Sequence, residues 1–251
     1  MMTALGRHPG MVSVVGMAGG LEITIPAGDG APATPAYAIL PKGATRGVVV
    51  IHEILGRRPE IDRVVERFAA AGYAAIAPDL FDRGKFACLR DTFAAMKTGT
   101  GVAVTQGRNA RAWLCSHAGL APSRIGLIGF CFGGGYALMA GAGWAAVSTN
   151  YGLVPEAEVM RELGPVIACY GTRDRSMAGS PRKLRERLAE VGHEPAEVHE
   201  LDAGHSFLTD ATQSWFKQQL PLMALGDYPD ARVVGWTKIL EFFERRLVSD
   251  S

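Results

Sequence analysis

The spacing of hydrophobic residues along this chain changes near residue 47. Before that point, residues 21–25 alternate apolar and polar side chains, and residues 36–40 form a second short apolar stretch. Such stretches are typical of half-buried strands, and the loop between them is rich in Gly, Pro and Ala. We therefore expect an antiparallel hairpin at the edge of a sheet. Residues 1–20 have little periodicity and are expected to be loosely ordered.

From residue 47 onward, strand patterns alternate with helix patterns. Residues 47–52, the sequence GVVVIH, form an apolar run that is expected of a strand covered on both faces. Further strands are predicted at 73–77, 124–129, 145–150, 165–170 and 196–201, and helices at 59–72, 88–96, 102–117, 181–191 and 231–247. This alternation predicts an α/β fold with a mostly parallel sheet and helices on both faces. The simplest organisation is one domain over residues 21–251.

Composition limits the possible partners and cofactors. A chain of 251 residues with 48% hydrophobic and 20% charged residues is long and apolar enough to bury a large core. The net charge of +1 and the scattered basic residues argue against nucleic-acid or membrane partners. The four cysteines, Cys88, Cys115, Cys131 and Cys169, have neither a C-x-x-C nor a zinc-site spacing. We expect reduced thiols in a cytoplasmic protein, with no metal and no cofactor.

The sequence Gly129-Phe-Cys-Phe-Gly133 joins a predicted strand to a predicted helix. With Cys131 in place of serine, it has the pattern of the nucleophile elbow found in α/β hydrolases. This sharp turn needs small residues two positions before and two positions after the nucleophile. The N–H groups at the start of the helix would favour a thiolate and later an oxyanion. The alternative is a buried structural cysteine in a glycine-rich turn.

Two further residues follow predicted strands in the order that a hydrolase triad requires. Asp174 comes shortly after the strand at 165–170, and His205 after the strand at 196–201. The carboxyl ends of parallel strands are where open α/β sheets place their sites. We therefore predict a triad of Cys131, Asp174 and His205. Taken singly, Asp174 could be a turn or cap residue, and His205 a loop histidine without a catalytic role.

The chain resembles the dienelactone hydrolase (carboxymethylenebutenolidase) family over about residues 20–248. The resemblance rests on four motifs: His52-Glu53-Ile54-Leu55-Gly56, the stretch from Ala71 to Arg83, Gly129-Phe-Cys-Phe-Gly-Gly134, and the pair Gly171-x-x-Asp174 with Gly204-His205-Ser-Phe207. It implies the α/β-hydrolase fold and the hydrolysis of a small lactone or ester.

The resemblance also implies roles for individual residues. Cys131 would attack the carbonyl carbon and form an acyl-enzyme. His205 would take the thiol proton, or hold the thiolate as an ion pair, and then activate water, while Asp174 would orient His205 and stabilise its imidazolium. The backbone N–H groups of Phe132 and Ile54 would form the oxyanion hole.

The family pattern is incomplete on the substrate side. Glu53 matches a family residue that contacts the thiol and helps to switch it between resting and active states, although it could also be a polar residue at a strand end. Arg83 occupies the first of two arginine positions that hold a substrate carboxylate, but Thr209 occupies the second. Loss of one charge-assisted contact costs about 1.5–3 kcal/mol, which leaves the substrate class open. Arg173 or Arg175 could compensate, or both could be solvated loop charges.

The leading hypothesis is a cysteine hydrolase of small-molecule lactones or esters, present as a monomer or homodimer. A broad carboxylesterase or thioesterase with the same triad is a second possibility. A third is a non-catalytic protein that binds a ligand or senses redox state through its thiol. A nucleotide site is disfavoured, because the glycine spacing is not G-x-G-x-x-G after the first strand. Residues 210–229 could form a mobile apolar wall over the site or pack in the core.

Overall fold

A single mixed sheet organises the protein. The computed structural model describes residues 19–81, 84–95, 97–209 and 221–248, and all statements about structure refer to these residues. Their strands form an eight-stranded sheet in the order β1-β2-β4-β3-β5-β6-β7-β8. The strands are β1 (Leu21–Ile25), β2 (Thr34–Ile39), β3 (Gly47–Ile51), β4 (Ala74–Pro78), β5 (Ile125–Phe130), β6 (Val147–Asn150), β7 (Val166–Gly171) and β8 (Glu197–Leu201). β1 and β2 form an antiparallel hairpin, β2 also pairs antiparallel with β4, and every other neighbouring pair is parallel.

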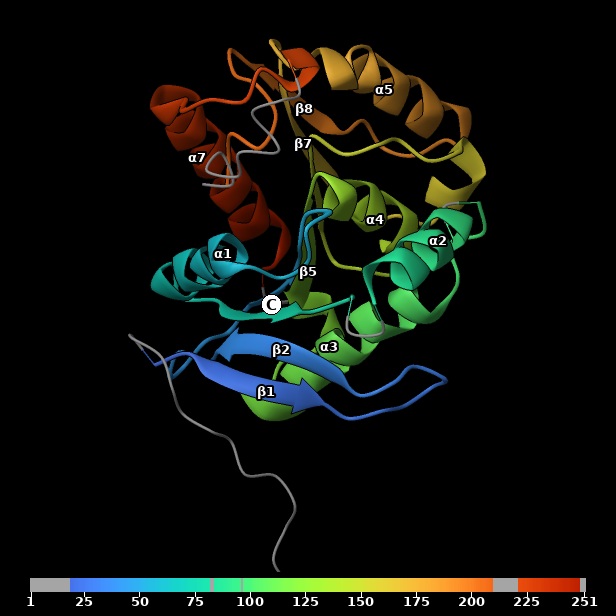
Figure 1. Ribbon diagram of the computed structural model, residues 1–251. Helices are drawn as coiled ribbons and strands as arrows, with labels where there is room; N and C mark the ends of the chain where they lie inside the picture. The colour runs from blue at the N-terminus through green and yellow to red at the C-terminus, as the bar shows by residue number, and fades with distance from the viewer. Residues whose placement is uncertain (1–18, 82–83, 96, 210–220, 249–251) are drawn as a thin grey trace, which may run out of the picture.

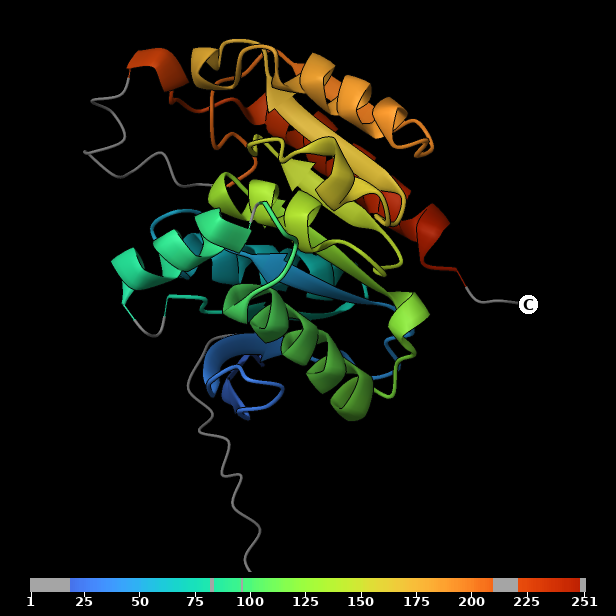
Figure 2. The same cartoon turned by 90° about the vertical axis from the view of Figure 1, so that its right-hand side faces the viewer.

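Helices cover both faces of the sheet. They are α1 (Pro59–Ala70), α2 (Lys85–Ala95), α3 (Val102–Ala118), α4 (Phe132–Ala140), α5 (Ser180–Glu190) and α7 (Pro229–Arg246). Short 3-10 helices are η1 (Pro122–Arg124), η2 (Ala157–Met160), η3 (Arg175–Met177) and η5 (Pro221–Met223). Helices α1 and α7 pack on one face, and α3, α4 and α5 lie on the other (Figure 1 and Figure 2). The predicted α/β class, the mostly parallel sheet and the edge hairpin are confirmed.

Helix α1 illustrates how the local sequence selects an element and its buried face. Proline at the first position has a fixed φ that suits a helix start, and Glu60 and Asp62 in the first turn complement the helix dipole. The buried residues recur at helical spacing: Ile61, Val64, Val65 and Phe68. Gly72, with φ of 85°, takes the left-handed conformation that follows the helix.

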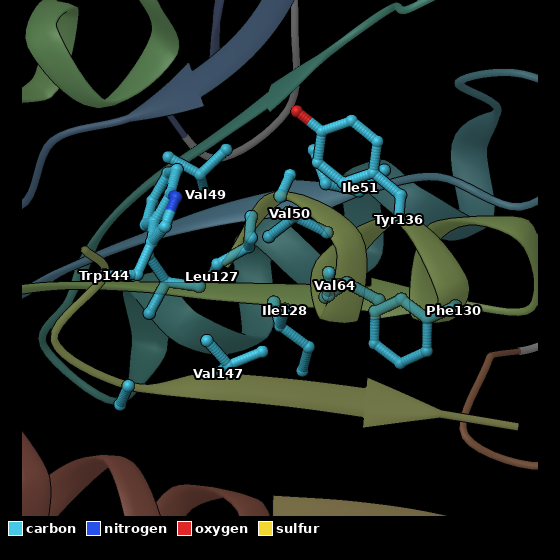
Figure 3. Close-up of a cluster of buried hydrophobic side chains, with 14 of the residues drawn as sticks. Val49, Val50, Ile51, Val64, Leu127, Ile128, Phe130, Tyr136, Trp144 and Val147 are labelled. Carbon is cyan, nitrogen blue, oxygen red and sulfur yellow. The ribbon is translucent and has the colours of Figure 1, made fainter. Parts of the chain in front are cut away.

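The core is thickest around the central strands. β3 and β5 are buried along their whole length, because helices cover both of their faces. Figure 3 shows Val49 of β3, Leu127 and Ile128 of β5 and Val147 of β6 as neighbours in this cluster. Each buried aliphatic side chain stabilises the fold by about 1.5–3 kcal/mol. The turn that follows β5 therefore starts from one of the best-supported positions in the sheet.

The structure matches the predicted elements closely. The helix predicted around residues 88–96 begins earlier, at Lys85. Residues 1–18 and 210–220 lie outside the described residues, so the expectations for the N-terminal segment and for most of 210–229 stay predictions. The division into one domain also stays a prediction. No described helix has both the length and the apolar character needed to cross a membrane.

Candidate active site

Cys131 sits in a strained backbone conformation between β5 and α4. Its φ of 54° and ψ of −112° fall in a region that non-glycine residues rarely adopt, at a cost of about 1–3 kcal/mol. The turn is held from the neighbouring strand, because the Cys131 N–H donates a 2.9 Å hydrogen bond to the Asn150 carbonyl. The side-chain amide of Asn150 donates in turn to the Gly129 carbonyl at 3.1 Å.

Steric contacts explain why glycine is needed two residues before and two residues after Cys131, at Gly129 and Gly133. A Cβ at Gly129 would overlap the Gly133 carbonyl group. A Cβ at Gly133 would lie 2.7 Å from the His52 carbonyl oxygen and closer still to that of Ile51. Helix α4 can therefore approach the end of β3 only without side chains at these two positions, and this approach brings two backbone segments together beside the thiol.

Asp174 and His205 meet at the carboxyl ends of β7 and β8. His205 Nδ1–H donates a 2.5 Å hydrogen bond to Asp174 Oδ2, and both side chains are buried. The other carboxylate oxygen accepts the Ser176 N–H at 3.0 Å and the Ser176 hydroxyl at 2.5 Å. Ser176 thus fixes the carboxylate so that its second oxygen faces the imidazole ring. The His205 N–H donates to the Met223 carbonyl at 2.7 Å, which anchors the loop.

The other ring nitrogen of His205 faces the cysteine. His205 Nε2 is buried and has no hydrogen-bond partner of good geometry among the described residues. Burial alone would lower the pKa of His205, but the Asp174 carboxylate and the nearby Cys131 sulfur raise it to about 10. Hydrogen bonds between catalytic groups are often long in a resting site and tighten when substrate binds. The arrangement favours an imidazolium beside the sulfur at neutral pH.

Two backbone N–H groups lie where the resemblance places the oxyanion hole. The Phe132 N–H belongs to the first turn of α4, where helix geometry provides no intrahelical acceptor. The Ile54 N–H lies in the turn after β3 and has no acceptor within the described chain. Both residues line the same cavity as Cys131.

Glu53 and Thr209 lie together in a buried polar cluster. The Thr209 hydroxyl is 2.8 Å from Glu53 Oε1 and 3.4 Å from the hydroxyl of Tyr151. Since a hydroxyl group has one proton, Thr209 donates to the carboxylate and accepts from Tyr151. Burial and the nearby Glu53 carboxylate hold the pKa of Tyr151 well above its usual value, so its hydroxyl stays a donor. Thr209, expected to contact substrate, is 2% exposed and does not line the cavity.

The cavity beside Cys131 is small and mostly apolar. It encloses about 100 Å³. Its wall is largely made of aromatic and aliphatic side chains: Ile54, Phe132, Tyr136, Tyr151, Leu153, Met177 and Met223. The described lining residues include no Asp, Glu, Lys or Arg. Arg83 lies outside the described residues. Arg173 makes a bidentate ion pair with Asp202 at the surface and does not line the cavity.

Sequence reasoning missed Tyr151 and Ser176. Tyr151 packs its ring 4.9 Å from that of His205 and adopts φ of 41° directly after β6. Its position at the carboxyl end of a strand, like those of Asp174 and His205, was a usable signal. Ser176 is two residues after Asp174, a spacing at which a side-chain carboxylate commonly accepts a local backbone N–H.

The strand order and the strand–cysteine–helix turn define an α/β hydrolase. The sequence matches the dienelactone hydrolase family over residues 34–247, and the chain belongs to this family. Family membership makes it a hydrolase of ester bonds.

Individual relatives are distant but similar along most of their length. Proteins named "Putative carboxymethylenebutenolidase" from Yersinia pestis and Methylorubrum extorquens are 27% and 28% identical to the chain. The first alignment covers 91% of this chain and 89% of the relative, and the second covers 77% and 74%.

Solved structures show the same fold. A dienelactone hydrolase-like promiscuous phosphotriesterase from metagenomic libraries superposes with a TM-score of 0.73 at 22% identity, covering 91% of this chain and 99% of that one. The dienelactone hydrolase from Anabaena variabilis has a TM-score of 0.60 at 18% identity, with coverage of 96% and 100%.

Proposed function

We propose that the protein hydrolyses small carboxylic esters or lactones through an acyl-enzyme formed on Cys131, with His205 as acid and base and Asp174 as its orienting group. One observation carries this proposal. Cys131 lines the same cavity as His205 and is close enough to raise the pKa of that ring, whose Nδ1–H is already bound to Asp174. That is the arrangement by which a base activates a nucleophile.

The first half of the reaction forms a thioester. In the ion pair that the raised pKa of His205 favours, the thiol proton already lies on His205 Nε2, and the Cys131 thiolate attacks the carbonyl carbon. The oxygen of the tetrahedral intermediate accepts hydrogen bonds from the N–H groups of Phe132 and Ile54. When the intermediate collapses, the C–O bond breaks and His205 returns the proton to the leaving oxygen. An ester releases an alcohol at this step, whereas the opened ring of a lactone stays attached.

The second half releases the acid. His205, now neutral, takes a proton from water, and the resulting hydroxide attacks the thioester carbonyl. A second tetrahedral intermediate forms in the same oxyanion hole. Its C–S bond breaks, the acid leaves, and the proton on His205 restores the starting pair with Cys131. The Asp174 carboxylate stabilises the imidazolium in both halves.

We infer that Thr209 acts through Glu53 and does not bind substrate. Its hydroxyl donates to Glu53 Oε1, so it helps to hold a buried carboxylate near Tyr151 and the cavity. The carboxylate matches the residue that the family uses to switch the thiol. A further negative charge on the substrate would be repelled here and would find no Lys or Arg among the described lining residues.

The proposed substrate therefore has a short, uncharged acyl group. The cavity is smaller than the 150 Å³ cavities that accept benzene, so it suits an acyl chain of about four or five non-hydrogen atoms. The relatives named carboxymethylenebutenolidase suggest a lactone that bears a carboxylate. A matched pair of substrates distinguishes an uncharged acyl group from one that bears a carboxylate. The pair is 4-nitrophenyl butyrate and the mono-4-nitrophenyl ester of succinic acid, which have nearly the same shape and differ in charge. We expect kcat/KM to favour the butyrate by at least about tenfold. A preference for the succinate would contradict the proposal of an uncharged acyl group, but it would not contradict the proposed ester hydrolysis.

The reaction class is tested with Cys131→Ala and His205→Ala on a panel of dienelactone, 4-nitrophenyl esters and acyl thioesters. Both variants should fold and lose turnover. Full esterase turnover in both would reject the site. Preference for the thioesters would identify a thioesterase, and labelling of Cys131 without any hydrolysis would favour a binding or redox-sensing protein.

A further inference from the structure

His52 is a buried histidine outside the proposed triad. It follows β3 directly, precedes Glu53 and Ile54, and is 0% exposed. Its ring contacts three segments that are far apart in the sequence, and two of them supply the proposed oxyanion donors.

The hydrogen-bond partners of His52 determine its tautomer. The Leu80 N–H lies 3.0 Å from His52 Nε2, and a backbone N–H can only donate, so Nε2 must present a lone pair. The Glu53 carbonyl oxygen lies 2.7 Å from His52 Nδ1, and a carbonyl can only accept, so Nδ1 must carry the proton. Asp79 Oδ1 is 3.7 Å from Nε2, beyond hydrogen-bond distance. Both partners therefore select the neutral ring with its proton on Nδ1.

The hydrogen bond from His52 fixes a catalytic peptide group. The Glu53 carbonyl and the Ile54 N–H belong to the same planar peptide unit, in which they point in opposite directions. The Gly56 N–H also donates to the Glu53 oxygen, at 3.0 Å. With its carbonyl held by two donors, the unit cannot rotate, and the direction of the Ile54 N–H is set.

The same ring also contacts the residue that supplies the second donor. His52 stacks on Phe132, with ring centroids 6.1 Å apart and planes 13° from parallel. The His52 backbone carbonyl is also one of the groups that exclude a side chain at Gly133. His52 thus lies between the turn after β3 and the start of α4, where the two donors converge.

We propose that His52 is a positioning residue that aims the Ile54 N–H at the substrate oxyanion through the Glu53 carbonyl. The proposal rests on the proposed function, since it assigns a role within that oxyanion hole. Leu80 holds the ring from the loop after β4 and so prevents the tautomer exchange that would remove the donor.

Three variants test whether the His52 side chain positions the Glu53–Ile54 peptide or only fills space in the core. The side-chain amide of His52→Asn occupies the place of Nδ1 and can still donate to the Glu53 carbonyl. His52→Gln places its amide near Nε2 and can still accept from Leu80. His52→Leu fills similar volume with neither contact. We expect His52→Asn to keep kcat for 4-nitrophenyl butyrate within about threefold. His52→Gln and His52→Leu should lose about tenfold or more with little change in KM, a part of the roughly 10²–10³ that removal of one oxyanion donor costs.

Two measurements accompany the kinetics. Melting temperatures show whether losses in kcat simply follow losses in stability. The 15N resonances of the imidazole ring report directly which nitrogen of His52 carries the proton. If kcat falls in the three variants in proportion to their melting temperatures, His52 only packs the core and the proposal fails. A proton on Nε2 also overturns it. If the wild-type protein hydrolyses no ester, the proposed function fails separately, and the positioning role within it fails too.

Discussion

His205 and His52 are both buried, yet His205 favours the charged imidazolium and His52 the neutral ring. His205, in the loop after β8, has a carboxylate on one nitrogen and a sulfur near the other, and its pKa is raised to about 10. His52, after β3, has backbone groups on both nitrogens, and burial is the main reason why its pKa is lowered. The contrast teaches that burial does not by itself set the charge of a histidine. The partners decide whether the ring moves protons or holds a peptide in place.

The largest expected effect is the loss of His205. His205→Ala removes the acid and base of both half-reactions, and kcat/KM should fall by about 10³–10⁴. His52→Asn is compared with it, because this variant also removes a buried histidine ring but keeps a donor for the Glu53 carbonyl. Steady-state kinetics with 4-nitrophenyl butyrate measure both. Similar losses in the two variants would mean that the histidines do not have separate roles.

Asp174→Asn tests what gives His205 its charge. We expect kcat/KM to fall by less than in His205→Ala, since the imidazole stays but the amide no longer stabilises its charged form. The pH profile should change as well. The wild-type alkaline limb should lie near the pKa of about 10, because above it His205 loses the proton that the leaving group needs. Without the carboxylate that pKa falls, so the limb should move to lower pH.

Asp202→Asn is the control for this variant. Asp202 lies on the same loop as His205, is exposed, and pairs with Arg173 at the surface. It should leave both the rate and the alkaline limb unchanged. An alkaline limb that stays in place in Asp174→Asn would show that the carboxylate does not control the charge of His205.

The smallest effect concerns the pH dependence of stability at His52. Burial lowers its pKa, although Asp79 and Glu53 act in the opposite direction and Arg57 in the same one. As pH falls below about 6.5, a histidine in the unfolded chain takes up a proton while folded His52 does not, so stability decreases. Between about pH 7.5 and about pH 5.5, His52→Asn should lose less unfolding free energy than the wild type. Urea unfolding at both pH values measures this. Equal losses would mean that folding does not lower the pKa of His52.

Much of the fold could be predicted from the sequence because its signals are local. The apolar run at residues 47–52 and the helical spacing in 59–72 locate β3 and α1 within a few residues. The alternation of such elements leaves few sheet topologies. Their pairing order needed the structure, since the insertion of β4 between β2 and β3 is not marked by any local pattern.

The site was predictable where a residue type and a strand end coincide, as at Cys131, Asp174 and His205. It was not predictable where the role depends on a contact across the fold. Thr209 reaches Glu53 across 156 positions of sequence, so its hydroxyl could not be assigned to a carboxylate in advance. His52 depends on the Leu80 N–H, 28 positions away, and a tautomer is fixed only when both partners are known.

The most direct test of the account is to trap the covalent intermediate. The protein is mixed with 4-nitrophenyl butyrate, quenched in acid during turnover, digested, and analysed by mass spectrometry. We predict a butyryl group on the peptide that contains Cys131 and none on the half-exposed Cys115. A protein that turns over the ester without this adduct, or that carries the acyl group on another residue, would contradict the assignment of Cys131 as the nucleophile.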